Sequence, residues 1–95
     1  MKQYLEVHYL VKAGLREEFY ERILSEGIDD ASRNEAGCEK YAYYFSADDP
    51  DELLLLEVWA DGEAVRLHGQ TPHFARLGEL KKEYVADTVI NRSVR

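Results

Sequence analysis

A short apolar segment, residues 53–58, constrains the fold of this chain more than any other feature. It reads Leu-Leu-Leu-Leu-Glu-Val, Trp59 follows it, and turn-forming residues lie on either side. An apolar run of this length between turn signals is typical of a β-strand that is covered on both faces. The segment therefore predicts a sheet at the centre of the fold, with something packed against each side.

A second strand precedes this one. Residues 38–46 are rich in aromatic side chains, which suit a pleated surface, and residues 47–51 read Ala-Asp-Asp-Pro-Asp. Two strands that are joined by a short polar turn form an antiparallel hairpin.

The first third of the chain changes period part-way along. Residues 2–11 alternate between two faces, one of which carries Val7 and Tyr9, and this period of two predicts a strand. From Leu15 onward, apolar residues recur at helical spacing, so we expect an amphipathic helix of about twenty residues. Gly27 weakens that helix and predicts a bend or a frayed turn there, and residues 34–37 end it.

The last third contains two helix starts and a final strand. Asp61 can cap a short helix that ends near His68, and Thr71-Pro72 supplies a hydroxyl cap followed by proline at the first helical position. Residues 88–94 return to strand-like composition. The buried face of the longer helix is expected to carry five residues: Phe74, Leu77, Leu80, Tyr84 and Val85.

The predicted order is β-α-β-β-α-β, with the second helix broken in two. This is the α+β, ferredoxin-like pattern, in which helices cover one face of a four-stranded antiparallel sheet. The chain has 95 residues and no repeats or linkers, so we expect a single domain over residues 1–95.

Such a fold leaves one sheet face without a cover, yet the strand at 53–58 is apolar on both sides. Hydrophobic residues make up 45% of the chain, which is more than one layer of helices can hide, and no further element remains. We therefore expect a homodimer that forms through the open sheet face.

Charge and composition exclude several classes of partner. The formal net charge is −7, with no stripe of Lys and Arg, which argues against nucleic-acid binding. No apolar run approaches the roughly 20 residues of a membrane span, and residues 1–11 lack the layout of a signal peptide, so we expect a cytoplasmic protein without membrane contact. The one cysteine, Cys38, has no partner for a disulfide or a redox pair.

Residues 54–74 carry a recognisable motif. The strand ends in Glu-x-Trp, then follow Asp-x-Glu-Ala, a His, and Thr-Pro-His-Phe. With Val-Lys-Ala-Gly at 11–14 and Asp49-Pro50 in the hairpin turn, the whole chain resembles the antibiotic biosynthesis monooxygenase family, whose members form dimeric α+β barrels and include quinol monooxygenases. The resemblance implies a cofactor-independent monooxygenase that oxidises a small quinol- or phenol-like compound with O₂, using no metal, haem or flavin.

The sequence departs from two branches of that family. The haem-degrading branch has an Asn on its first strand, where this chain has Val7, and a His in its last helix, where residues 75–85 contain none. The polyketide-tailoring branch has an Asn where this chain has Leu55. A third relative isomerises a phosphorylated dione and shares the His and Thr-Pro-His pattern, so an isomerase stays open as an alternative.

Three residues are candidates for catalysis. His68 and His73 can accept and return a proton near neutral pH. Glu57 lies within an apolar run, where a carboxylate needs a partner; it either orients a histidine or forms a buried ion pair at the dimer face. Packing alone is the alternative for both histidines.

The expected substrate is small and aromatic or dione-like, and four side chains are candidates for binding it. Trp59 and Phe74 offer flat apolar walls, and Tyr41 and Tyr43 offer hydroxyl donors. We expect no metal site, because the two histidines are not at i, i+4 spacing, Pro72 intervenes, and there is no cysteine cluster. Glu57 is the carboxylate that could complete a set of two histidines and one carboxylate. A dimeric module that binds a ligand without catalysis is the remaining alternative.

Overall fold

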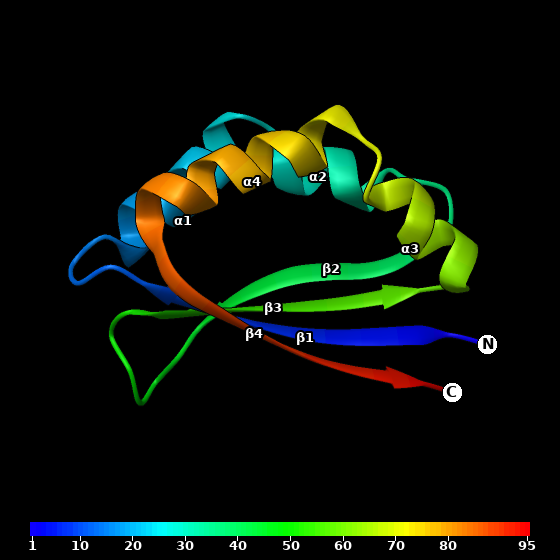
Figure 1. Ribbon diagram of the computed structural model, residues 1–95, viewed down its shortest axis with the longest axis horizontal. Coiled ribbons are helices and arrows are strands. Elements are labelled where there is room, and N and C mark those ends of the chain that lie inside the picture. The colour runs from blue at the N-terminus through cyan, green and yellow to red at the C-terminus, as the bar shows by residue number, and fades with distance from the viewer.

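A four-stranded antiparallel sheet forms one layer of the molecule and four helices form the other (Figure 1). The computed structural model describes residues 1–95. The strands, in spatial order β2-β3-β1-β4, are β1 (Gln3–Val11), β2 (Cys38–Phe45), β3 (Glu52–Trp59) and β4 (Val85–Val94). The helices are α1 (Arg16–Ser25), α2 (Ile28–Arg33), α3 (Gly62–His68) and α4 (Pro72–Tyr84). This arrangement confirms the predicted ferredoxin-like α+β fold.

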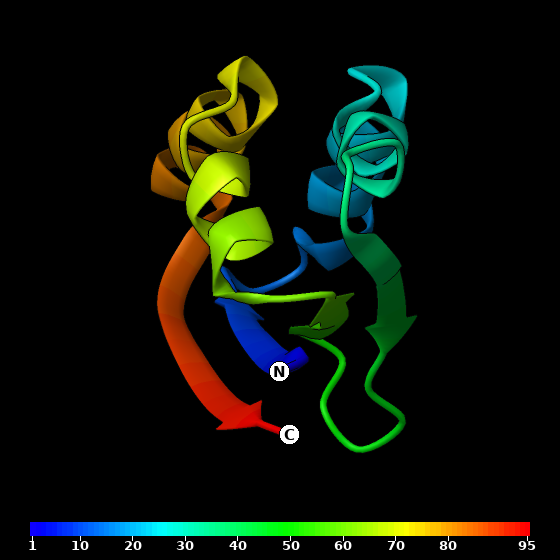
Figure 2. The same ribbon diagram turned by 90° about the vertical axis from the view of Figure 1, so that its right-hand side faces the viewer.

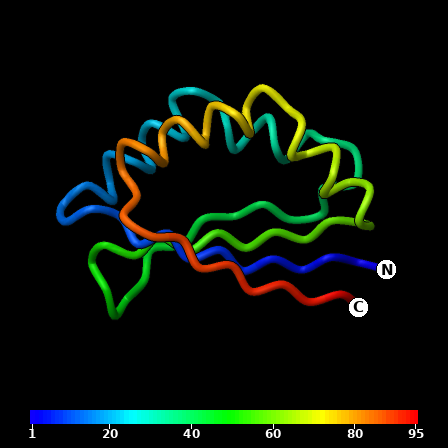
Figure 3. Tube along the Cα trace, in the orientation of Figure 1, coloured from blue at the N-terminus to red at the C-terminus, as the bar shows by residue number.

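All four helices cover the same face of the sheet. In the end-on view, α1 and α2 lie over one half of the sheet and α3 and α4 over the other, and the opposite face is bare (Figure 2). Both termini lie at the same end of the sheet (Figure 3). There the backbone N–H of Lys2 donates to the carbonyl of Arg95 at 2.7 Å, and that of Arg95 donates back at 2.9 Å. None of the helices has the length and apolar composition that crossing a membrane would need.

The predicted alternation decides which side chains enter the core. Val7 and Tyr9 of β1 point toward the helices and are buried, as are the odd-numbered residues of β3 from Leu53 to Trp59. From the helices, Phe19 of α1 and Leu80 of α4 meet them. The core therefore lies between one sheet face and the helix layer.

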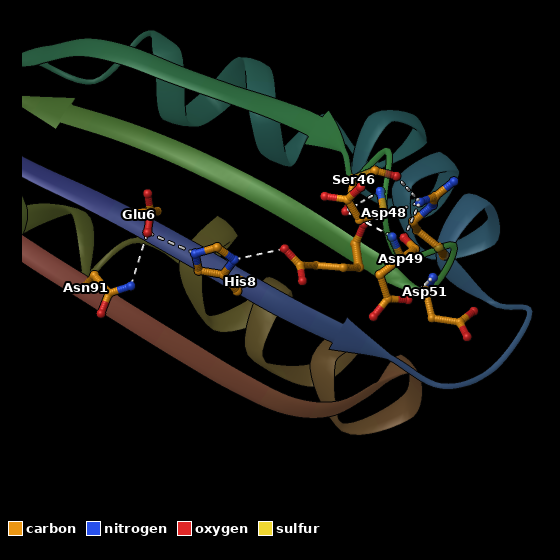
Figure 4. Close-up of polar contacts among 9 residues, drawn as sticks. Glu6, His8, Ser46, Asp48, Asp49, Asp51 and Asn91 are labelled. Atoms are coloured by element: carbon orange, nitrogen blue, oxygen red, sulfur yellow. Dashed lines mark hydrogen bonds and ion pairs between the residues drawn. The ribbon is translucent and has the colours of Figure 1, made fainter.

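The open face combines apolar and charged side chains. His8 Nδ1 lies 2.9 Å from Glu52 Oε2, and His8 Nε2 lies 2.9 Å from Glu6 Oε2, which also accepts from Asn91 at 3.1 Å (Figure 4). Ionised carboxylates only accept, so this geometry favours a doubly protonated ring, and these hydrogen bonds, to Glu6 above all, raise the pKa of His8. The His8 side chain lies on the sheet face opposite the helices.

Apolar side chains surround this charged group. Leu54, Leu56 and Val58 of β3 are only half-buried on the open face. Near Tyr4, Leu56 and Val58 the face is hollowed to a volume of about 390 Å³.

The β2–β3 turn is held by local hydrogen bonds, as its composition suggested. Ser46 Oγ accepts from the backbone N–H of Asp48 at 3.2 Å and of Asp49 at 3.1 Å (Figure 4). Arg16 of α1 donates to the carbonyl of Asp49 at 3.0 Å. The hairpin is thereby tied to the helix layer.

Three expectations need correction. The long first helix is two helices, because Gly27 adopts a left-handed conformation (φ 69°) that ends one and begins the next. β4 begins at Val85 rather than at residue 88, since Val85 pairs with Val11 across an irregular register, and it therefore does not belong to the buried face of α4. Phe74 was expected in the core but is 44% exposed.

Candidate functional site

Two helix caps position the histidines at one end of the sheet. β3 ends at Trp59, and the Asp61 side chain then accepts from the backbone N–H of Ala64 at 2.9 Å and starts α3, which ends at His68. Thr71 caps α4 by accepting from Phe74 N–H at 3.2 Å, and its hydroxyl donates to the carbonyl of His68 at 2.8 Å. Both caps are the ones that the sequence predicted.

Glu35 joins the two histidines. It lies in the turn between α2 and β2, and its Oε2 is 2.5 Å from His68 Nδ1 and 2.7 Å from His73 Nε2. A carboxylate oxygen only accepts, so each of these nitrogens carries a proton toward Glu35. In the neutral rings the lone pair is then on the other nitrogen, which is Nε2 in His68.

An aromatic enclosure surrounds the ring of His68. Its centroid lies 4.6 Å from that of Trp59 at an interplanar angle of 34°, and 5.2 Å from that of Phe74 at 80°. Tyr41 approaches edge-on at 5.7 Å. His68 is only 5% exposed, so its ring is shielded from bulk water.

Glu57 faces the helices from the middle of the sheet. Trp59 Nε1 donates to its Oε1 at 2.9 Å. Burial raises the pKa of Glu57, and the Trp59 N–H and nearby His68 oppose this by stabilising the ionised form. The alternative of an ion pair at the dimer face is wrong, because Glu57 shares the inner face of β3 with Trp59.

Tyr43 packs against Tyr41, which in turn contacts His68. Its centroid is 5.9 Å from that of Tyr41, and its hydroxyl is buried without any hydrogen-bond partner. Burial raises the pKa of both phenols, so both remain protonated at neutral pH and can donate. An unpaired buried hydroxyl costs free energy that a bound ligand oxygen would recover.

The structure thus places five of the other six proposed residues around His68, and the sixth, Tyr43, adjoins Tyr41. Sequence reasoning missed Glu35, which stands in a turn without any motif. His68 lines neither the hollow on the open sheet face nor the one between α4 and β4. Phe74, which packs against His68, is 44% exposed.

The arrangement can support proton transfer and can also supply metal ligands. Glu35, His68 and His73 offer one carboxylate oxygen and two imidazole nitrogens, all within 4.8 Å of one another. These are donor types that bind divalent transition metals.

The sequence profile of the antibiotic biosynthesis monooxygenase family matches residues 3–80 of the chain. The chain belongs to this family. The expectation drawn from the motif at 54–74 is thereby confirmed. Membership associates the chain with monooxygenase-like proteins.

Two curated relatives in bacteria show the same kinship. The uncharacterized protein sll1783 of Synechocystis is 34% identical over 76 residues, which cover 80% of this chain and 50% of that protein. The putative monooxygenase YcnE of Bacillus subtilis is 30% identical over 70 residues, covering 74% of this chain and 72% of YcnE. The aligned part of the chain thus spans only half the length of the Synechocystis protein.

Solved structures share the whole fold. A conserved protein from Methanosarcina mazei superimposes with a TM-score of 0.88 at 25% identity, covering 100% of this chain and 93% of that one. PA3566 from Pseudomonas aeruginosa gives a TM-score of 0.86 at 26% identity and covers 99% and 93%. A structure described as an antibiotic biosynthesis monooxygenase, at 21% identity and a TM-score of 0.84, covers 98% and 97% and shows the same fold.

Proposed function

We propose that this protein is a cofactor-independent monooxygenase that oxidises a small quinol- or phenol-like compound with O₂. The observation that carries the proposal is the state of His68. Its Nδ1 is fixed on Glu35, its Nε2 has no hydrogen-bond partner within the chain, and aromatic rings surround the imidazole. A buried imidazole with one nitrogen anchored and the other free is arranged to act as a general base.

The first step is removal of the phenolic proton by His68 Nε2. Glu35 stabilises the resulting imidazolium through its hydrogen bond to Nδ1. Trp59 and Phe74 contact the His68 ring, and the half-exposed Phe74 offers an apolar surface for the substrate ring. The unpartnered Tyr43 hydroxyl is the donor that would stabilise the developing phenolate oxygen.

The remaining steps need no electron source beyond the substrate. The phenolate passes one electron to O₂, and recombination of the two radicals forms a bond between ring carbon and oxygen. The imidazolium of His68 protonates the distal peroxide oxygen. His68, now neutral, takes up the ring proton as the O–O bond breaks and the ring carbonyl forms, and the hydroxide that leaves receives this proton and becomes water. The sum is a phenol plus O₂ giving a quinone plus H₂O.

Turnover with ¹⁸O₂ tests this reaction. We expect one O₂ consumed per quinone formed, with one ¹⁸O atom in the product and one in water. His68→Ala should lower kcat by about 10²- to 10⁴-fold, the usual contribution of a general base. His8→Ala is the matched control, because His8 lies on the opposite sheet face and should keep full activity. Turnover that continues without O₂ would overturn the proposal.

An isomerase is the second candidate, and the shared carboxylate favours it. Because Glu35 contacts both histidines through one oxygen, protons can be exchanged at two points of one substrate without any oxidant. This reaction predicts anaerobic turnover of a dione-like compound and loss of activity in His73→Ala. If neither His68→Ala nor His73→Ala changes the binding of a ligand and no turnover is found, a non-catalytic binding module is the better description.

We also propose that two copies associate through the open sheet face. The support comes from Leu54, Leu56 and Val58, which form an apolar strip on β3 that no element of the chain covers. The hollow beside this strip provides room for side chains of a second copy. Such a dimer would leave the helix layers outside and the two histidine sites apart.

A further inference from the structure

The side chains of Glu35, His68 and His73 come from three different parts of the fold. Glu35 follows α2, His68 ends α3 and His73 lies in the first turn of α4. The nearest atoms of these side chains lie within 4.8 Å of one another, and each side chain is largely shielded from solvent. Two imidazoles and one carboxylate at one point are the ligand set of many sites for divalent transition metals.

We propose that these three side chains form a binding site for a divalent transition-metal ion of the Zn²⁺ or Co²⁺ type. The ligand atoms are Glu35 Oε2, His68 Nδ1 and His73 Nε2. Three protein ligands leave a fourth position of a tetrahedral ion for water, as in zinc sites that are not purely structural.

Movements of about 1–1.5 Å within the cluster bring the ligands to coordination distance. With metal–ligand bonds of about 2.0–2.1 Å, ligand atoms in a tetrahedral site stand about 3.3 Å apart. The two contacts of Glu35, now 2.5 and 2.7 Å, must lengthen by less than 1 Å. His68 Nδ1 and His73 Nε2, which lie within 4.8 Å of each other, must approach by up to about 1.5 Å. Glu35 belongs to a turn and has three rotatable side-chain bonds, whereas the Thr71 cap ties the end of α3, at His68, to the first turn of α4, which carries His73.

Metal binding would change the tautomer of His68. Now Nδ1 carries the proton toward Glu35, but a metal needs the Nδ1 lone pair, so the proton must move to Nε2. Nε2 is the atom that the proposed function uses as a base. Zn²⁺ should therefore inhibit turnover by occupying the partner nitrogen, and a chelator should restore it.

The metal site uses side chains of the proposed function, but metal binding does not depend on the monooxygenase reaction. Titration of the full chain with ZnCl₂ by calorimetry reads the binding directly. We expect one Zn²⁺ per chain, and Co²⁺ should give the visible absorption of a tetrahedral site. Glu35→Gln and His73→Ala should each weaken binding by more than about tenfold, since the loss of a ligand exceeds the usual effect of an outer-shell change.

The matched controls are Glu52→Gln and His8→Ala, which break a similar histidine–carboxylate contact on the other sheet face. Both should bind Zn²⁺ like the wild type. The proposal is overturned if Glu35→Gln and His73→Ala, shown to be folded by circular dichroism, bind as the wild type does, or if the controls lose binding instead. If the chain binds no Zn²⁺, the metal-site proposal is overturned but the monooxygenase proposal stands. If the chain binds Zn²⁺ but shows no O₂-dependent turnover, the metal-site proposal stands and the monooxygenase proposal is overturned.

Discussion

At the scale of single residues, Glu57 is a buried carboxylate with one strong donor. Trp59 Nε1 lies 2.9 Å from it, and burial raises its pKa above the ordinary value of 4.5. The group is protonated in both the folded and the unfolded chain at low pH. As the pH rises above 4.5, the Glu57 carboxyl of the unfolded chain ionises first. The free energy of unfolding therefore falls until the pH passes the folded-state pKa, and it is constant above that pH.

Glu57→Gln keeps an oxygen that can accept from the Trp59 N–H but cannot ionise. The variant should therefore become more stable than the wild type as the pH rises. From pH 4 to pH 8 the free energy of unfolding of the variant should rise relative to the wild type, by about 1.4 kcal/mol for each tenfold shift in the ionisation equilibrium. Urea denaturation at several pH values measures it, with Glu21→Gln on an exposed site of α1 as the control. A constant difference between variant and wild type would contradict the prediction.

The Tyr43 hydroxyl gives the second prediction at this scale. It is buried without a partner, so Tyr43→Phe should raise the free energy of unfolding of the ligand-free protein by roughly 1 kcal/mol. The same change should weaken a phenolic ligand by up to about tenfold, because one donor is removed. Thermal unfolding and equilibrium binding check the two effects. Tyr44→Phe, 44% exposed on the other face, should change neither; a destabilised Tyr43→Phe would show that the hydroxyl has a partner.

At the scale of elements, two glycines fix where the helices begin and where β2 starts. Gly27 has a φ of +69° and open space around it, whereas Gly37 has a φ of +85° and a Cβ there would lie 2.7 Å from the Cβ of Ala64. Both positions disfavour side chains, but only Gly37 also has a steric limit. Gly78, inside α4, has neither restriction.

These three positions predict an order of stabilities. Gly27→Ala should cost about 1 kcal/mol through backbone strain, and Gly37→Ala about 2–4 kcal/mol because α3 must also move. Gly78→Ala should stabilise by about 0.5–1 kcal/mol through helix propensity. Urea midpoints of the three variants give the order. If Gly27→Ala and Gly37→Ala lower the free energy of unfolding equally, α3 can move away from residue 37 at no cost in stability.

At the scale of the whole molecule, the sheet face opposite the helices is the surface that no element of the chain covers. If two copies pack through it, Leu56→Lys should produce a folded monomer, because the side chain points away from the core. Sedimentation equilibrium measures the mass. Leu67→Lys is the matched control, since Leu67 of α3 is 47% exposed in the helix layer and should leave the mass of the dimer unchanged. A Leu56→Lys variant with the wild-type mass would exclude this interface.

The same scale shows why part of the fold was predictable. Caps and periodicity are local, so Asp61 and Thr71 marked the starts of α3 and α4, and the alternation of residues 3–11 marked the faces of β1. The start of β4 was not predictable, because Val85 joins the strand through its pairing with Val11 and not through any pattern of its own.

The candidate site divides in the same way. By itself, the amino-acid sequence determined the order of elements and placed Trp59, His68 and His73 close together, because short segments link them. Only the tertiary structure decided that Glu57 faces the helices, since Leu53 to Val58 is apolar on both sides and either face could have been the inner one. It also decided that Glu35, 33 residues before His68, stands between the two histidines. A contact across that separation arises from the packing of α2 and β2 beside α3 and α4, which no local pattern encodes.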